Sequence, residues 1–158
     1  MKVCSSLRIM SALLFGVLIC LSVLRGQSLS EIYSQYGTIR KVSLKNAPFP
    51  HPRRAQGYTY RDQLFPAEKH YQDSSVAIFI PNYFRPGRRV DFVVHFHGWN
   101  TNIDSVLQRF RLIEQLSGSC KNAILIVPQG PNNAPDSFGG KLENPAGFKY
   151  FMDEIMLY

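Results

Sequence analysis

The sequence predicts an α/β fold in which antiparallel N-terminal strands are followed by parallel strands with crossover helices. Two apolar runs carry this prediction, Val90–Phe96 and Ala123–Val127, and an amphipathic segment separates them. Short runs that are apolar on both faces are typical of strands in a covered sheet. Two such strands joined by a helix form a parallel pair with a right-handed crossover.

The first 26 residues predict a signal peptide. Lys2 and Arg8 precede the uncharged, mainly apolar segment Ile9–Leu24, and small residues follow Arg25. This is the pattern of a secretory signal. We therefore expect a secreted or periplasmic protein. An uncleaved membrane anchor is the alternative, and it is less favoured because the apolar run is shorter than the ~20 residues of a membrane span. Any membrane contact would come through this segment alone.

The distribution of charge argues against a nucleic-acid-binding protein, and the cysteine content argues against a disulfide-stabilised one. The formal net charge is +7, but three of the 18 basic residues lie in the signal segment. The others form isolated pairs separated by turn residues, whereas binding to phosphates requires clustering. We therefore expect no nucleic-acid partner. Cys120 is the one cysteine outside the signal segment, so an internal disulfide framework is excluded.

The segment before the apolar runs predicts few elements. Residues 27–56 show a weak pattern with a Pro-rich basic stretch, and we expect an extended lead-in over the domain surface. Gly57–Leu64 alternates tyrosines with polar residues, which predicts an edge strand. Ser75–Ile80 predicts the next strand, and the short turn between them favours an antiparallel hairpin that enters the sheet. Residues 57–158 thus form the predicted domain.

Two helices are predicted. Apolar residues at three- and four-residue intervals indicate a helix from Ile103 to Leu116, which ends at Gly118. Asn144–Pro145 predicts the start of a second helix, with Asn as the N-cap. The apolar face of this helix consists of Phe148, Phe151, Met152, Ile155 and Met156.

The second helix lacks a stop pattern. Asp153 and Glu154 lie in its last turns, where the helix dipole disfavours acidic residues, and no Gly or basic residue follows. We therefore expect that the chain is a fragment of a longer protein and that the sheet is incomplete at its C-terminal side. An unpaired apolar strand edge promotes aggregation, so poor solubility is expected when the chain is expressed alone.

The order of these elements resembles the first half of the α/β-hydrolase fold, above all its secreted esterase-type members. The resemblance covers residues 57–158. It is carried by VVHFHGW at Val93–Trp99 and ILIVPQG at Ile124–Gly130, followed by Ser137–Gly140 and Asn144–Pro145. The resemblance implies that the Val90 strand lies between the Ala123 strand and a further strand that this sequence does not contain.

The resemblance also implies a site. In the family, residues after the His-Gly dipeptide bring a backbone N–H to the oxyanion hole. Here that donor is the N–H of Trp99, with Gly98 allowing a tight turn and His97 bracing it. Loop contacts to the substrate are expected from Asn100, Gln129 and Ser137. No cofactor is implied, and the substrate of the complete enzyme would be a small-molecule or polymeric ester.

The catalytic triad is not found in the sequence. The family's nucleophile lies in a G-x-S-x-G elbow, and its acid and base come later. Ser137 has the nearest pattern, but Pro135 replaces the first Gly and no strand leads into it. We therefore expect the N-terminal part of an exported serine hydrolase, acting on esters rather than amides, which is inactive by itself.

Two alternatives remain open. His95 and His97 lie two residues apart on a strand and point to the same side, a spacing that can hold zinc. The Asp-His pair that usually extends this pattern is absent, so no metal site is predicted. The second alternative is a non-catalytic exported module that binds carbohydrate or a cell surface through tyrosines: Tyr58, Tyr60, Tyr71 and Tyr83.

Overall fold

The computed structural model describes residues 28–158, so the predicted signal peptide lies outside the described residues. The chain divides after Ile32, and the described part of the first unit holds the short helix α2, Leu29–Ile32. The second unit, Tyr33–Tyr158, contains the sheet and the other elements described in residues 28–158. Among the residues described, no helix has the length and apolar character needed to cross a membrane.

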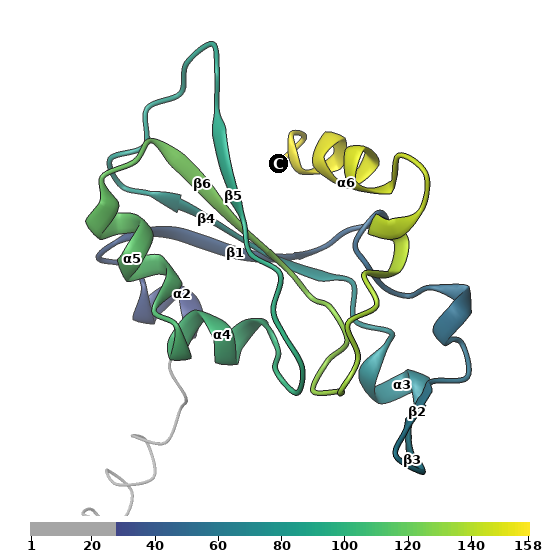
Figure 1. Ribbon diagram of the computed structural model, residues 1–158. Helices are drawn as coiled ribbons and strands as arrows, with labels where there is room; N and C mark the ends of the chain where they lie inside the picture. The colour runs from purple at the N-terminus through teal and green to yellow at the C-terminus, as the bar shows by residue number, and fades with distance from the viewer. Residues whose placement is uncertain (1–27) are drawn as a thin grey trace, which may run out of the picture. The chain divides into compact units, whose positions relative to one another are not determined.

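The second unit is built on a mixed four-stranded sheet of order β1-β4-β6-β5 (Figure 1). Strand β1 (Gly37–Ser43) is antiparallel to β4 (Ser75–Pro81), and β4 is antiparallel to β6 (Ala123–Pro128). Strand β5 (Asp91–Val94) is parallel to β6. The predicted α/β class is confirmed, with antiparallel N-terminal strands and a parallel strand–helix–strand unit.

The first strand of the sheet lies in a segment for which the sequence predicts none. Strand β1 falls within residues 27–56, and the side chains of Leu44, Ala47 and Phe49 behind it are fully buried. The expected surface lead-in is therefore wrong, because this segment contributes to the core. Arg40 and Lys41, which are both exposed, are neighbours in the middle of β1. They interrupt the alternation of apolar and polar residues by which a strand is recognised in a sequence.

The strand expected at Gly57–Leu64 does not enter the sheet. Strands β2 (Tyr58–Tyr60) and β3 (Gln63–Phe65) pair only with each other, as a separate hairpin. Its two turn residues, Arg61 and Asp62, both have positive φ, at 48° and 63°. Such a turn matches the twist of a tight two-residue hairpin. The short helices η1 (Pro52–Arg54) and α3 (Ala67–His70) flank this hairpin in the chain.

Helices cover both faces of the sheet (Figure 1). Helices α4 (Ile103–Arg109) and α5 (Leu112–Ser119) lie on one face, where a single helix was predicted. Asn102 is the N-cap of α4, since its side chain accepts from the N–H of Ser105 at 2.9 Å. The predicted single helix is interrupted at Arg111, whose φ is 49°, and no Gly or Pro marks this interruption in the sequence.

The other face carries the C-terminal helix α6 (Gly147–Ile155), which follows η2 (Gly140–Glu143). One apolar cluster joins this helix to the sheet: Leu44, Ala47, Val76, Ile78, Ile126, Phe151 and Ile155. The helix begins later than predicted because Ala146 has φ 57°, so Asn144 is not its N-cap. Phe148 and Met156, expected on the buried face, are exposed.

Strand β5 lies at the edge of the described sheet. It pairs with β6 on one side, and within residues 28–158 no strand pairs with its other side. Val93 and Phe96 are exposed, although the sequence predicts a run covered on both faces. Phe92 and Val94 pack against the cluster under α6.

Candidate functional site

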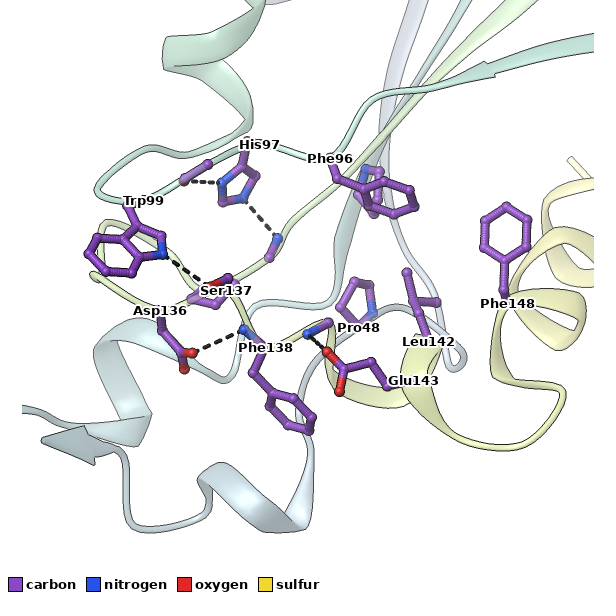
Figure 2. A pocket seen from close by; sticks show the side chains of 15 residues that line it. Pro48, Phe96, His97, Trp99, Asp136, Ser137, Phe138, Leu142, Glu143 and Phe148 are labelled. Carbon is purple, nitrogen blue, oxygen red and sulfur yellow. Dashed lines mark hydrogen bonds between the residues drawn. The ribbon is translucent and has the colours of Figure 1, made fainter. Parts of the chain in front are cut away.

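A cavity of about 430 Å³ opens beyond the carboxyl ends of β5 and β6 (Figure 2). Open α/β sheets place ligands at this edge, and the volume falls in the range of ~300–1,000 Å³ found for small-molecule sites. The walls come from the turn after β5, the loop after β6 and the start of α6. They are mainly apolar and aromatic, with Phe96, Trp99, Phe138, Leu142 and Phe148 among them.

His97 joins the two loops that form the cavity. Its Nε2 accepts from the backbone N–H of Gly130 at 2.8 Å and from the side-chain amide of Gln129 at 2.8 Å. The orientation of that amide is fixed, because its Oε1 accepts from the N–H of Ile103 at 3.1 Å. Nε2 is therefore unprotonated and the imidazole proton lies on Nδ1. Burial lowers the pKa of His97, and a hydrogen bond with the Gly98 carbonyl opposes this only in part.

The same ring holds the peptide between Gly98 and Trp99. The Gly98 carbonyl accepts from Nδ1–H of His97 at 3.1 Å and from the hydroxyl of Thr101 at 2.6 Å. In a trans peptide the N–H points opposite to the C=O, so the Trp99 N–H points away from both donors. It makes no hydrogen bond within the described part of the chain. A fixed peptide with an unused N–H is what an oxyanion hole requires.

The turn is not made by glycine. A Cβ added at Gly98 would meet no atom within 4 Å, so the predicted need for glycine there is wrong. The left-handed residue of the turn is Asn100, with φ 53°, and its N–H donates to the Ala134 carbonyl at 3.0 Å. Gly130, in the facing loop, has His97 as a close neighbour, since a Cβ there would lie 3.3 Å from the His97 ring.

The cavity brings together four of the six predicted site residues. His97, Gly98, Trp99 and Ser137 line it, whereas Asn100 and Gln129 do not. Gln129 is only 1% exposed and binds His97 and Ile103 instead of facing the cavity. The Ser137 hydroxyl accepts from the Trp99 indole N–H at 3.2 Å (Figure 2).

A largely buried ion pair supports the far wall, and no pattern in the sequence indicates it. Asp136 accepts from Nε of Arg54 at 2.7 Å and from its Nη2 at 3.2 Å, and the two side chains are 6% and 15% exposed. The guanidinium also lies over the rings of Tyr58 and Phe138, at 4.6 and 4.8 Å. Eighty-two residues separate the partners, so no local pattern could pair them.

The ion pair determines the protonation state of Asp136. Burial by itself raises the pKa of this carboxyl, but hydrogen bonds from Arg54 and the Phe138 N–H outweigh burial and lower the pKa below its usual range. Asp136 is thus an ionised carboxylate, and each of its two oxygens accepts a hydrogen bond from Arg54.

The residues of the two alternative sites, the zinc site with His95 and the tyrosine surface, can be located as well. His95 packs against Phe110, with ring centroids 6.1 Å apart, and its buried Nε2 has no hydrogen-bond partner among the described residues. Burial lowers the pKa of His95. Across residues 28–158, no group of three His, Cys, Asp or Glu side chains could hold a metal ion. Of the four tyrosines, Tyr71 is buried and Tyr83 donates its hydroxyl to the Leu116 carbonyl at 2.9 Å.

Comparison with known proteins gives no relative: no family model, curated protein or solved structure matches this chain.

Thr101→Val is expected to loosen the Gly98–Trp99 peptide. The variant removes a hydroxyl that donates to the Gly98 carbonyl, so we expect a stability loss of about 1 kcal/mol. We also expect a changed or broadened amide resonance for Trp99, measured by NMR. Thr101→Ser keeps the hydroxyl and should retain the wild-type resonance. An unchanged Trp99 amide in the Val variant would show that His97 alone fixes this peptide.

Proposed function

We propose that this chain forms the oxyanion-hole part of an exported serine hydrolase that cleaves esters. The observation that carries the proposal is the Gly98–Trp99 peptide beside an apolar cavity. Its carbonyl receives two hydrogen bonds, while its N–H makes none with the described residues. A preorganised N–H can stabilise the oxyanion of a tetrahedral intermediate, and removing one such donor typically costs ~10²–10³ in kcat.

The sheet supports this proposal. The resemblance to α/β-hydrolases implies that the Val90 strand lies between the Ala123 strand and another one. Strand β5 pairs with β6, and in the described part of the chain its second edge is open. The His97–Trp99 turn follows β5 at the carboxyl end of the parallel pair, where this family places its oxyanion donor.

In this proposal the triad comes from outside the described site. His97 cannot act as the base, since both of its nitrogens are engaged. Asp136 is paired with Arg54, and Ser137 has no histidine partner among the described residues. A serine from a further strand would attack the ester carbonyl, its histidine would take the proton, and the Trp99 N–H would stabilise the developing O⁻.

Two measurements test the proposal. With nitrophenyl esters, the 158-residue chain is expected to give background rates only. The nucleotide sequence after the Tyr158 codon is expected to encode an apolar strand and then G-x-S-x-G within ~30 residues. Efficient ester turnover by this chain alone, or a stop codon with no such continuation, would contradict the proposal.

A non-catalytic exported binding module is the second candidate. The cavity favours this candidate, because it is present in the described residues and can bind a ligand without a catalytic triad. Saturable ligand binding without hydrolysis by any longer product of the gene would support this candidate over the enzyme.

Val93→Lys is expected to reduce association of the chain when it is expressed alone. Val93 is exposed on β5, whose outer edge has no partner strand in the described residues, and a charge on an edge strand opposes edge-to-edge pairing. The soluble fraction and its sedimentation measure the effect. Met156→Lys adds the same charge at the exposed end of α6 and serves as the control. Equal improvement in both variants would show that net charge, not the edge, governs solubility.

A further inference from the structure

We infer that the cavity binds an uncharged aromatic carbonyl compound, with its ring against Phe96 and Phe148 and its carbonyl oxygen on the Trp99 N–H. As a statement about the substrate, that it is an aromatic ester, the inference rests on the proposed function. As a statement about binding, it depends only on the cavity.

The apolar end of the cavity suits an aromatic ring. The rings of Phe96 and Phe148 contact each other, with their centroids 6.4 Å apart, and both line the cavity together with Leu142 (Figure 2). Both phenylalanines are exposed although they are large and apolar. Aromatic rings favour edge and offset contacts at ~4.5–7 Å, so an aromatic ligand can contact both side chains at once.

The charges around the cavity select an uncharged ligand. No Lys or Arg is among the described residues that line it. The negative charge of Asp136 is already paired with Arg54. Glu143 accepts from the Gly139 N–H at 2.6 Å and has no cationic partner in the described region, so its charge opposes an anion. A carboxylate or phosphate ligand would lose its hydration without gaining a counter-charge.

The polar end offers donors to a carbonyl oxygen. The Trp99 N–H makes no hydrogen bond to any residue in 28–158, and the bonds to the Gly98 carbonyl fix the plane of its peptide. The Ser137 hydroxyl accepts from the Trp99 indole, which leaves its own proton free to donate. An uncharged carbonyl oxygen can accept from both groups, whereas a simple hydrocarbon would use neither.

NMR titration with propiophenone tests the inference. This ketone has the ring and carbonyl of an aromatic ester but no bond that a hydrolase cleaves. Trp99 is the only tryptophan in the chain, so its indole N–H resonance is identified without further assignment. We expect a saturable shift of this resonance and of the Trp99 amide. Phenylpropanoate, an anion of similar size, is expected to bind at least about tenfold more weakly, a difference of ~1.4 kcal/mol.

A matched pair of variants locates the binding site. Phe148→Ala is expected to weaken propiophenone binding about fivefold. Phe110→Ala, outside the cavity, is expected to have no effect, and the two side chains are equally exposed at 44% and 43%. The absence of a saturable shift, equal binding of the anion, or equal weakening in both variants would overturn the inference.

The result also separates the inference from the proposed function. If propiophenone binds as described and the longer gene product hydrolyses no ester, the inference stands and the enzyme proposal fails. If that product hydrolyses esters but propiophenone does not bind, the inference fails and the enzyme proposal stands.

Discussion

Replacing Arg54 by Met is expected to lower the free energy of unfolding by about 3–5 kcal/mol, which is typical when one partner of a buried ion pair is removed. The substitution leaves the Asp136 carboxylate, 6% exposed, without its main hydrogen-bond donor. It also removes a cation from the faces of Tyr58 and Phe138. Urea unfolding at neutral pH, followed by circular dichroism, measures the loss.

Lys149→Met provides the matched control, since Lys149 and Asp153 form an exposed pair one helical turn apart. Exposed pairs of this kind contribute little to stability, so the control should remain close to wild type. The double variant Arg54→Met, Asp136→Leu removes both charges and should recover most of the lost stability. A single Arg54 variant as stable as the control would mean that Asp136 finds other donors or becomes hydrated.

The ion pair also predicts a dependence on acid. The pKa of folded Asp136 lies below its ordinary value of 3.8, so its stabilising contribution is present above that value. The contribution is lost as the pH falls through the lowered pKa, where the carboxylate takes up a proton. Asp136→Asn should lack this part of the acid transition, which unfolding curves at a series of acidic pH values can measure.

The parts of the fold that were predicted from sequence are those with strong local patterns. The apolar runs of β5 and β6 and the periodic segment between them lie close together in the chain, and their pairing follows from the crossover rule. Strand β1 was missed because Arg40 and Lys41 interrupt its alternation. The break between α4 and α5 was missed because no Gly or Pro marks it, and the residue with positive φ there is Arg111.

The candidate site likewise contains some residues that could be predicted from sequence and others that could not. The His97–Trp99 turn could be predicted because the His97 ring and the Gly98–Trp99 peptide that it braces are adjacent in sequence. The Arg54–Asp136 pair and the role of Gln129 could not, because each depends on partners that only the folded sheet brings together. Gln129 follows a buried strand, as a substrate-binding residue would, and only its bond to Ile103 shows that it turns inward.

His97→Phe is expected to cost about 2–4 kcal/mol at neutral pH, because the N–H groups of Gly130 and Gln129 lose their shared acceptor. The ring shape is kept, so the loss reports the hydrogen bonds and not a cavity. Denaturant unfolding measures it. A loss below about 1 kcal/mol would mean that water replaces the imidazole as acceptor, and that His97 does not hold the two loops together.

The pH dependence of stability provides a second test of His97. Its folded-state pKa is below the ordinary 6.5, so its contribution is complete above that pH and is lost as the pH falls through the lowered pKa. Buried His95 acts in the same direction, and each histidine can contribute a slope of at most ~1.4 kcal/mol per pH unit. Below pH 6.5 the wild type should therefore lose stability, each single Phe variant should lose less, and the double variant least. If His97→Phe keeps the full slope, Nε2 is not the required acceptor, and the fixed Gly98–Trp99 peptide must be explained by Thr101 alone.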